Sequence, residues 1–177
     1  MAGKKNELGA TGRTVASNIA SLRQGQRLGF AELSRILSDL GRPIPPLGLR
    51  RIEDEERRVD VDDLVSIAVA LGVSPITLLM PSTPNASDEV LSSASLEAVS
   101  AQRLWRWYRA ERPLLGDVTA SGLLDFVADA FPEWRRIEYA AGVERLLDLR
   151  RTEIKAGSED RSALDALMTE DTPDGDD

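Results

Sequence analysis

Between residues 30 and 79 the chain repeats short apolar patterns of helical period, each interrupted by glycine or proline. The first pattern ends at Gly41, which suits the left-handed residue after a helix, and Pro43 prevents its continuation. The next pattern begins at Pro45 or Pro46, because proline is tolerated in the first turn of a helix. This punctuation restricts the stretch to short helices that pack against one another.

One helix is expected before this stretch, and two more follow within it. Asp60 caps the first of these two, and Ser74 caps the second, which opens on Pro75. We expect the helix after Asp60 to bury Val61, Leu64, Val65, Ile67, Ala68 and Leu71. The expected helices cover residues 14–26, 30–40, 46–53, 61–71 and 75–79, and together they form a compact all-α domain.

Charge is distributed unevenly along the sequence. Residues 1–52 contain nine Lys/Arg and three Asp/Glu, although the whole chain has a formal net charge of -8. Residues 53–81 and 82–177 are both acidic. Because salt screens charges beyond about 10 Å, a basic face can attract phosphates while acidic parts face elsewhere.

The composition argues against most enzyme classes. The chain has neither Cys nor His, so it cannot build the usual zinc sites, a Ser-His-Asp triad or a cysteine nucleophile. It has no Walker-type loop and no GxGxxG stretch. We therefore expect no enzyme, no metal and no cofactor. No apolar run is long enough to span a membrane, and the N-terminus lacks the apolar centre of a signal peptide, so we expect a cytoplasmic protein.

The run Leu49-Arg50-Arg51-Ile52-Glu53 resembles the end of the recognition helix in the Cro and phage-repressor (Xre) family of helix-turn-helix proteins. Two apolar residues three apart anchor such a helix, so Arg50 and Arg51 face outward, where the major groove of DNA would lie. Arginine suits that position because its planar fork can bond a guanine edge or a phosphate. The resemblance implies that bases are also approached by Pro46, Leu47 and Gly48.

The resemblance covers roughly residues 14–80, and it implies a buried ion pair between Arg23 and Glu53. The sequence departs from the family where Gly29 and Phe30 replace the usual Ser or Asn followed by Gln. Glu55 likewise stands where a glycine is usual. Three further arginines are expected to contact the DNA backbone: Arg42, Arg57 and Arg58.

The rest of the chain reads as a linker and a smaller helical region. Helices are expected over 96–112 and over 132–156, and a shorter helix capped by Ser121 is expected between them. The resulting organisation is a flexible basic arm (1–13), a DNA-binding domain (14–81), a linker (82–95), a helical C-terminal region (96–156) and an acidic tail (157–177). Aromatics at helical spacing usually form core, but they also favour interfaces. The candidates for dimerisation are Trp105, Trp107, Tyr108, Trp134, Ile137 and Leu147.

The sequence therefore predicts a dimeric, sequence-specific transcriptional regulator of a bacterium or phage, more specifically a repressor. Its partners would be double-stranded DNA and a second copy of the chain, because one recognition helix reads only a few base pairs. The operator and any small-molecule effector stay open. The alternative is a helix-turn-helix that has lost DNA contact and serves as an antitoxin-like or scaffold module.

Overall fold

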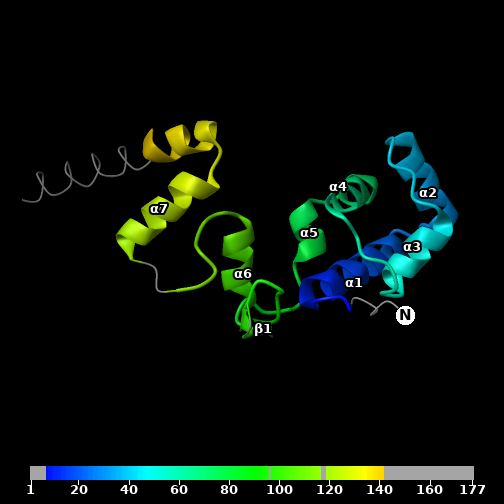
Figure 1. Cartoon of the computed structure of the whole chain (residues 1–177), viewed down its shortest axis with the longest axis horizontal. Coiled ribbons are helices and arrows are strands. Elements are labelled where there is room, and N and C mark those ends of the chain that lie inside the picture. The colour runs from blue at the N-terminus through cyan, green and yellow to red at the C-terminus, as the bar shows by residue number, and fades with distance from the viewer. Residues whose placement is uncertain (1–6, 96, 117–118, 142–177) are drawn as a thin grey trace, which may run out of the picture. The chain divides into compact units, whose positions relative to one another are not determined.

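The computed structural model of the chain describes residues 7–95, 97–116 and 119–141. Its described elements are mostly helices, as the sequence predicts, together with one small antiparallel sheet that the sequence analysis did not anticipate. The elements, shown in Figure 1, are α1 (Ala10–Gly25), α2 (Phe30–Asp39), α3 (Pro46–Glu53), α4 (Val61–Ala70), α5 (Pro75–Leu79), β1 (Glu89–Val90), β2 (Val99–Ser100), α6 (Ala101–Tyr108) and α7 (Ala120–Ala130).

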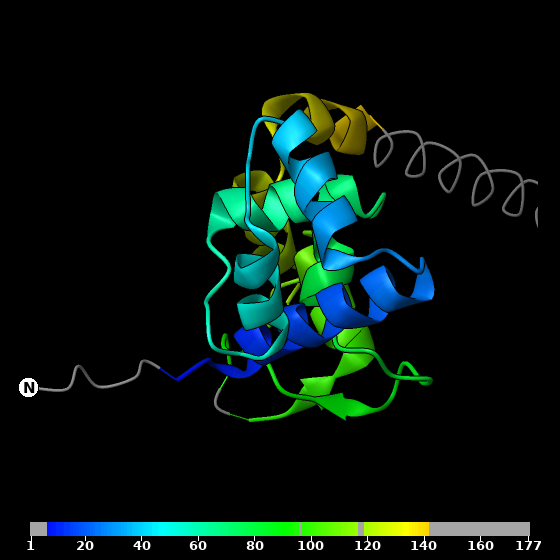
Figure 2. The ribbon, with the colours of Figure 1, turned by 90° about the vertical axis from the view of Figure 1, so that its right-hand side faces the viewer.

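Helices α1 to α5 share one hydrophobic core. Helix α3 packs against α1 and α2, and α5 packs against α1 and α4, as Figure 2 lets the reader follow from the side. The buried residues of this core come from all five helices and from the α2–α3 loop: Val15, Ile19, Leu33, Leu37, Ile44, Leu49, Ile52, Ile67, Ala68, Leu71 and Leu78. Helix α3 contributes only two of them, and four of its other residues are exposed: Pro46, Leu47, Arg50 and Arg51.

The turn signals predict the helix ends of this core well. Gly41 and Gly72 both adopt positive φ angles after α2 and α4, at 79° and 67°. Helix α3 begins at Pro46, as expected. The Asp60 side chain caps α4 by accepting a hydrogen bond of 2.7 Å from the backbone N–H of Asp63. These residues fix the end of α2, the start of α3 and both ends of α4.

Two expectations about the first core are wrong. Helix α1 begins at Ala10 rather than near residue 14, so residues 10–13 are helical and not part of a flexible arm. The Thr11 hydroxyl accepts a hydrogen bond of 3.0 Å from the Ser93 backbone N–H, which ties this first turn to the chain after α5. In α4, Val61 and Val65 are exposed, because this helix is apolar almost all round and only one side of it meets the core.

The segment expected to be a linker carries structure of its own. Strand β1 pairs with β2 in antiparallel register, so the expected helix over 96–112 is shortened to α6. A second small core forms around this hairpin from Val90, Ala101, Leu104 and Leu114. The Tyr108 hydroxyl donates a 3.4 Å hydrogen bond to the Leu79 carbonyl, so this part is attached to the end of α5.

The chain divides into two compact units after Leu123. Helix α7 starts at Ala120, so Ser121 is not its cap as expected; the Thr119 hydroxyl accepts a hydrogen bond of 3.1 Å from the Gly122 N–H instead. Residues 133–141 are helical, in line with the expected helix that begins at Pro132. The remainder of that helix and the acidic tail lie outside the described residues.

Candidate nucleic-acid interface

Helix α3 separates its apolar and basic side chains, as the sequence predicts. Leu49 and Ile52 are completely buried in the first core. Arg50 and Arg51, which lie between them in the sequence, are exposed on the opposite side. This arrangement follows from the helical period, because residues three apart share a face and the intervening pair is directed away from it. The result is a short helix that presents two guanidinium groups to solvent.

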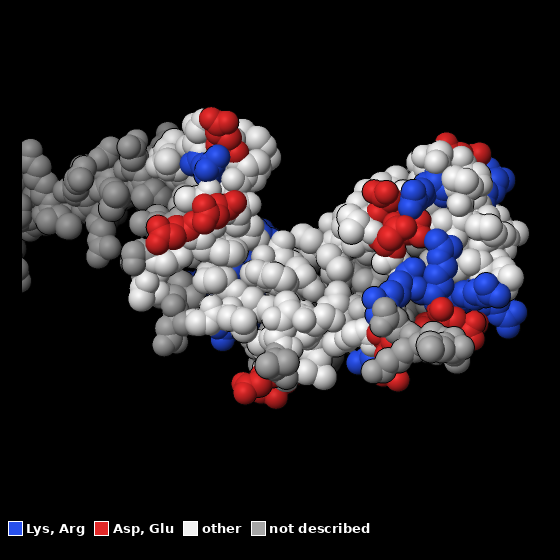
Figure 3. All heavy atoms as spheres, in the orientation of Figure 1, with Lys and Arg blue, Asp and Glu red and all other residues white. Residues whose placement is uncertain are grey.

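The two arginines differ in their surroundings. Arg50 has an exposed carboxylate, Asp54, one turn away, with its Nε 3.7 Å from that side chain. At the surface such a pair contributes little to stability and is easily exchanged for another partner. Arg51 has no carboxylate partner among the residues that the structure describes. In Figure 3, Lys and Arg atoms gather in a band over the part of the molecule that holds α3, with Asp and Glu atoms along its border.

The start of α3 is only partly as the sequence predicts. Pro46 is exposed, and Leu47 exposes 58% of its surface, although it is a large apolar residue. Gly48 instead faces the protein. A Cβ atom built there would lie 2.8 Å from Nη1 of Arg57 and 3.2 Å from Cγ2 of Ile44. Because Gly48 has no side chain, it leaves room for Arg57. This role within the fold is separate from the close approach to DNA that the resemblance implies.

The ion pair between Arg23 and Glu53 is present. Arg23 donates from Nε and Nη2 to the two carboxylate oxygens at 2.6 and 2.8 Å, and the two side chains are only 11% and 8% exposed. The hydrogen bonds that Arg23 donates to Glu53 raise the pKa of Arg23 above its ordinary value, against the opposing effect of burial. Arg23 also lies 4.0 Å from the centre of the Phe30 ring. The Phe30 ring therefore covers the Arg23 side of this bridge.

Arg42 and Arg57, expected as contacts to the DNA backbone, are instead bound by the protein's own carboxylates. Arg42 donates to Asp63 at 2.9 Å and to Asp60 at 3.0 Å, and Arg57 donates to Asp63 at 2.6 Å. Asp62 lies 3.7 Å from Arg42. The hydrogen bond to Asp63, and the charges of all three carboxylates, raise the pKa of Arg42. These two arginines connect the α2–α3 loop and the α3–α4 loop to the start of α4.

Asp63 holds both arginines, a role that the local sequence pattern does not predict. It is 1% exposed and accepts from both arginines. The available signal was the run Asp60-Val61-Asp62-Asp63, which holds more acid than a helix start needs, facing two arginines on neighbouring loops.

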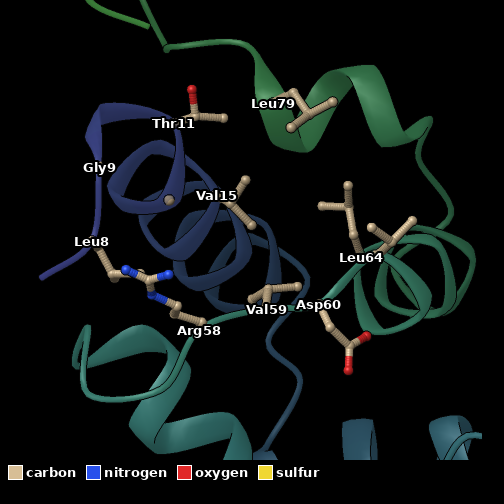
Figure 4. A pocket seen from close by; sticks show the side chains of 11 residues that line it. Leu8, Gly9, Thr11, Val15, Arg58, Val59, Asp60, Leu64 and Leu79 are labelled. Carbon is tan, nitrogen blue, oxygen red and sulfur yellow. The ribbon is translucent and has the colours of Figure 1, made fainter. Parts of the chain in front are cut away.

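Arg58, the third expected backbone contact, donates to the carbonyl of Glu7 at 3.0 Å. It borders a pocket of about 310 Å³ between α1 and the start of α4, whose walls include Leu8, Val15 and Leu64. Figure 4 shows Arg58 and Leu8 side by side at one end of this pocket. Arg58 is exposed, but its position is tied to the segment before α1 rather than to α3.

The dimerisation candidates differ in how exposed they are within each unit. Trp107 and Tyr108 are half-buried and pack against the second core, with their rings 5.1 Å apart. Trp105 is exposed at the surface of the first unit, whereas Trp134 and Ile137 are exposed in the second. Leu147 lies outside the described residues. Trp107 and Tyr108 are therefore largely core residues, while Trp105, Trp134 and Ile137 remain candidates.

Comparison of the chain with models of protein families, with curated proteins and with solved structures gave no match. Among the described residues, no helix combines the length and the apolar character needed to cross a membrane.

Proposed function

We propose that the chain is a sequence-specific DNA-binding transcriptional regulator with a Cro/repressor-like helix-turn-helix, in which α3 enters the major groove. The observation that carries the proposal is the division of α3 into a buried apolar side, Leu49 and Ile52, and an exposed basic side, Arg50 and Arg51. An arginine without an internal partner can bond a guanine edge or a phosphate at no cost in protein contacts.

The ion pairs of Arg42 and Arg57 reduce the set of residues that we propose to contact DNA. Arg42 and Arg57 are paired with Asp60 and Asp63, so the proposed DNA contacts rest mainly on α3, with Leu47 available for the methyl group of a thymine and the exposed Arg58 for the backbone. The regulator acts as a homodimer in this account, since a second α3 would read a second half-site about one DNA turn away. Repression then needs no chemistry beyond occupying the site.

The test compares the wild type with Arg50→Ala/Arg51→Ala on pooled GC-rich duplex fragments at two salt concentrations. We expect tight, salt-sensitive binding by the wild type and a loss of at least tenfold in the variant, because each specific base contact contributes about 1–3 kcal/mol. Arg135→Ala is the matched control, since Arg135 is an exposed arginine of the second unit that is paired with Glu138. Circular dichroism should be the same for all three proteins.

A second candidate function, that of a protein-interaction module, is favoured by the surroundings of α3. Leu47 is an exposed apolar residue on the same helix as Arg50 and Arg51, and two of the three arginines expected at the DNA backbone, Arg42 and Arg57, are paired with carboxylates. Equal and weak DNA binding by the wild type and the double variant would support this module over the regulator.

Sedimentation over a range of concentrations tests the dimer: Trp134→Ala should raise the dissociation constant of the dimer if the exposed aromatics form the interface.

A further inference from the structure

A pocket of about 350 Å³ lies beside α6 and the loop that follows it, far in sequence from α3. Three arginines line it: Arg103, Arg106 and Arg112. The other described residues of its lining are uncharged, namely Ser100, Gln102, Pro113 and Gly116. A concave site with three cationic side chains and no carboxylate among its described lining is unexpected in a chain with a net charge of -8.

The fold itself brings these arginines together. After α6 the chain reverses at Ala110, which has a φ of 58°, and the Glu111 N–H donates to the Arg106 carbonyl at 2.9 Å. Leu114 then anchors the loop in the second core, where it is 5% exposed. Finally, Arg103 donates to the Gly116 carbonyl at 3.0 Å. The loop is therefore held by apolar packing and backbone hydrogen bonds, and these hold Arg112 beside the pocket.

Three guanidinium groups that line one pocket repel one another and give it an excess of positive charge that an anion can neutralise. Arginine stays protonated in proteins, so the repulsion cannot be relieved by loss of a proton. The carboxylate nearest in sequence, Glu111, is bound to Arg109 at 2.9 Å and is not in the pocket lining. Neither Arg106 nor Arg112 is paired with a carboxylate in the described part of the chain. A bound anion would remove this repulsion.

We propose that this pocket binds the phosphate group of a small phosphorylated ligand. A phosphate monoester carries about 1.5 to 2 negative charges near neutral pH, which suits three arginines better than a single carboxylate does. The arginine fork also matches the spacing of phosphate oxygens. The pocket volume falls in the range of small-ligand sites, roughly 300–1,000 Å³. This site does not depend on α3 or on DNA binding.

The experiment is isothermal titration of the full chain with inorganic pyrophosphate at low ionic strength, repeated with inorganic phosphate. We expect binding by the wild type that weakens about tenfold in Arg112→Gln and further in Arg106→Gln/Arg112→Gln, because charge-assisted hydrogen bonds are lost. Arg112 is exposed on a loop, so the single variant tests the site without disturbing α6. Added sodium chloride should weaken the binding of both anions.

Two controls separate this site from the proposed DNA interface. Arg109→Gln removes an arginine of the same region that is paired with Glu111, and Arg51→Gln removes one from α3; both should bind pyrophosphate within about twofold of the wild type. Failure of the wild type to bind, or equal losses in Arg109→Gln and Arg112→Gln, would overturn the proposal. It is also overturned if Arg106→Gln/Arg112→Gln weakens duplex DNA binding while leaving pyrophosphate binding unchanged, since the pocket would then hold the DNA backbone.

Discussion

Arg23 and Glu53 are thirty residues apart in the sequence, yet Arg23 donates two hydrogen bonds to the Glu53 carboxylate across the first core. One partner lies on α1 and the other is the last residue of α3, so the pair fixes the end of α3 to α1. The Arg23 guanidinium also donates to the Leu28 carbonyl at 2.8 Å, in the turn after α1. The orientation of the exposed arginines on α3 therefore depends on a contact on the opposite side of that helix.

Glu53→Ala should lower the free energy of unfolding by about 3 kcal/mol, because it leaves the Arg23 charge buried without its partner. Urea denaturation monitored by circular dichroism measures this. Arg23→Met/Glu53→Leu, which replaces both charges by apolar groups of similar size, should recover most of the loss. A Glu53→Ala protein as stable as the wild type would show that solvent reaches the pair more freely than its exposure indicates.

Gly48→Ala tests the contact between α3 and Arg57. In an unconstrained helix this change adds about 1 kcal/mol of stability. Here the new methyl group would meet Nη1 of Arg57, whose guanidinium donates to Asp63 through Nη2 and is held in place, so we expect no gain or a small loss. In an Arg57→Ala background the gain should return in part, with Ile44 still limiting it. Additive effects in this double-mutant cycle would contradict the contact.

Glu55→Gly should stabilise the protein by up to about 1 kcal/mol, because Glu55 has a left-handed backbone that glycine adopts without strain. Its φ is 59°, and the Glu56 N–H closes the end of α3 by donating to the Arg51 carbonyl at 2.8 Å. Thermal unfolding gives the comparison, and Glu56→Gly is the control at a neighbouring exposed position without positive φ. A lower melting temperature for Glu55→Gly would refute this reading of the turn.

Acid should destabilise the fold partly through Asp60. The Asp63 N–H that donates to this carboxylate, and Arg42 behind it, hold the pKa of Asp60 below its ordinary value of 3.8. A lowered pKa stabilises the folded state above the ordinary pKa, and this stabilisation is lost as the pH falls through the folded pKa. Stability measured from pH 6 to pH 2 should therefore decline less steeply in Asp60→Asn, which keeps a capping side chain.

Asp88 provides an independent comparison for the acid profile. The Thr83 hydroxyl, followed by Asn85, lowers the pKa of Asp88 by hydrogen bonding to its carboxylate. Asp88→Asn should remove its own part of the acid-dependent loss, and Asp60→Asn/Asp88→Asn should remove both parts. An acid profile that neither variant changes would mean that these carboxylates are not held as the structure has them.

Local rules predict the elements around α3, because its boundaries are set by residues with strong conformational preferences. Pro46 starts the helix, Gly41 ends the one before it, and Leu49 and Ile52 recur at the helical period. The pairing of Arg23 with Glu53 came from the family resemblance and not from any local pattern. What local rules supply is therefore the shape of α3 and its outward-facing pair of arginines.

Tertiary contacts explain what the sequence did not predict. Val61 looks like a core residue in an almost continuously apolar helix, but the side that meets the core is chosen by the other helices. Arg42 looks free in its loop, and only the fold brings it to Asp63. Strand β1 is only two residues long and forms by pairing with β2. No periodic pattern in the sequence predicts this pairing.

The most direct test of DNA reading by α3 is selection of bound sequences from a random duplex pool, carried out with the wild type and with Arg51→Ala. We expect a recovered site with two related halves about one DNA turn apart, and a loss of base preference at one or two positions of each half in the variant. A wild-type pool without any enriched sequence would contradict DNA reading by α3. Recovery of the unchanged wild-type site by both Arg51→Ala and Arg50→Ala would contradict it as well.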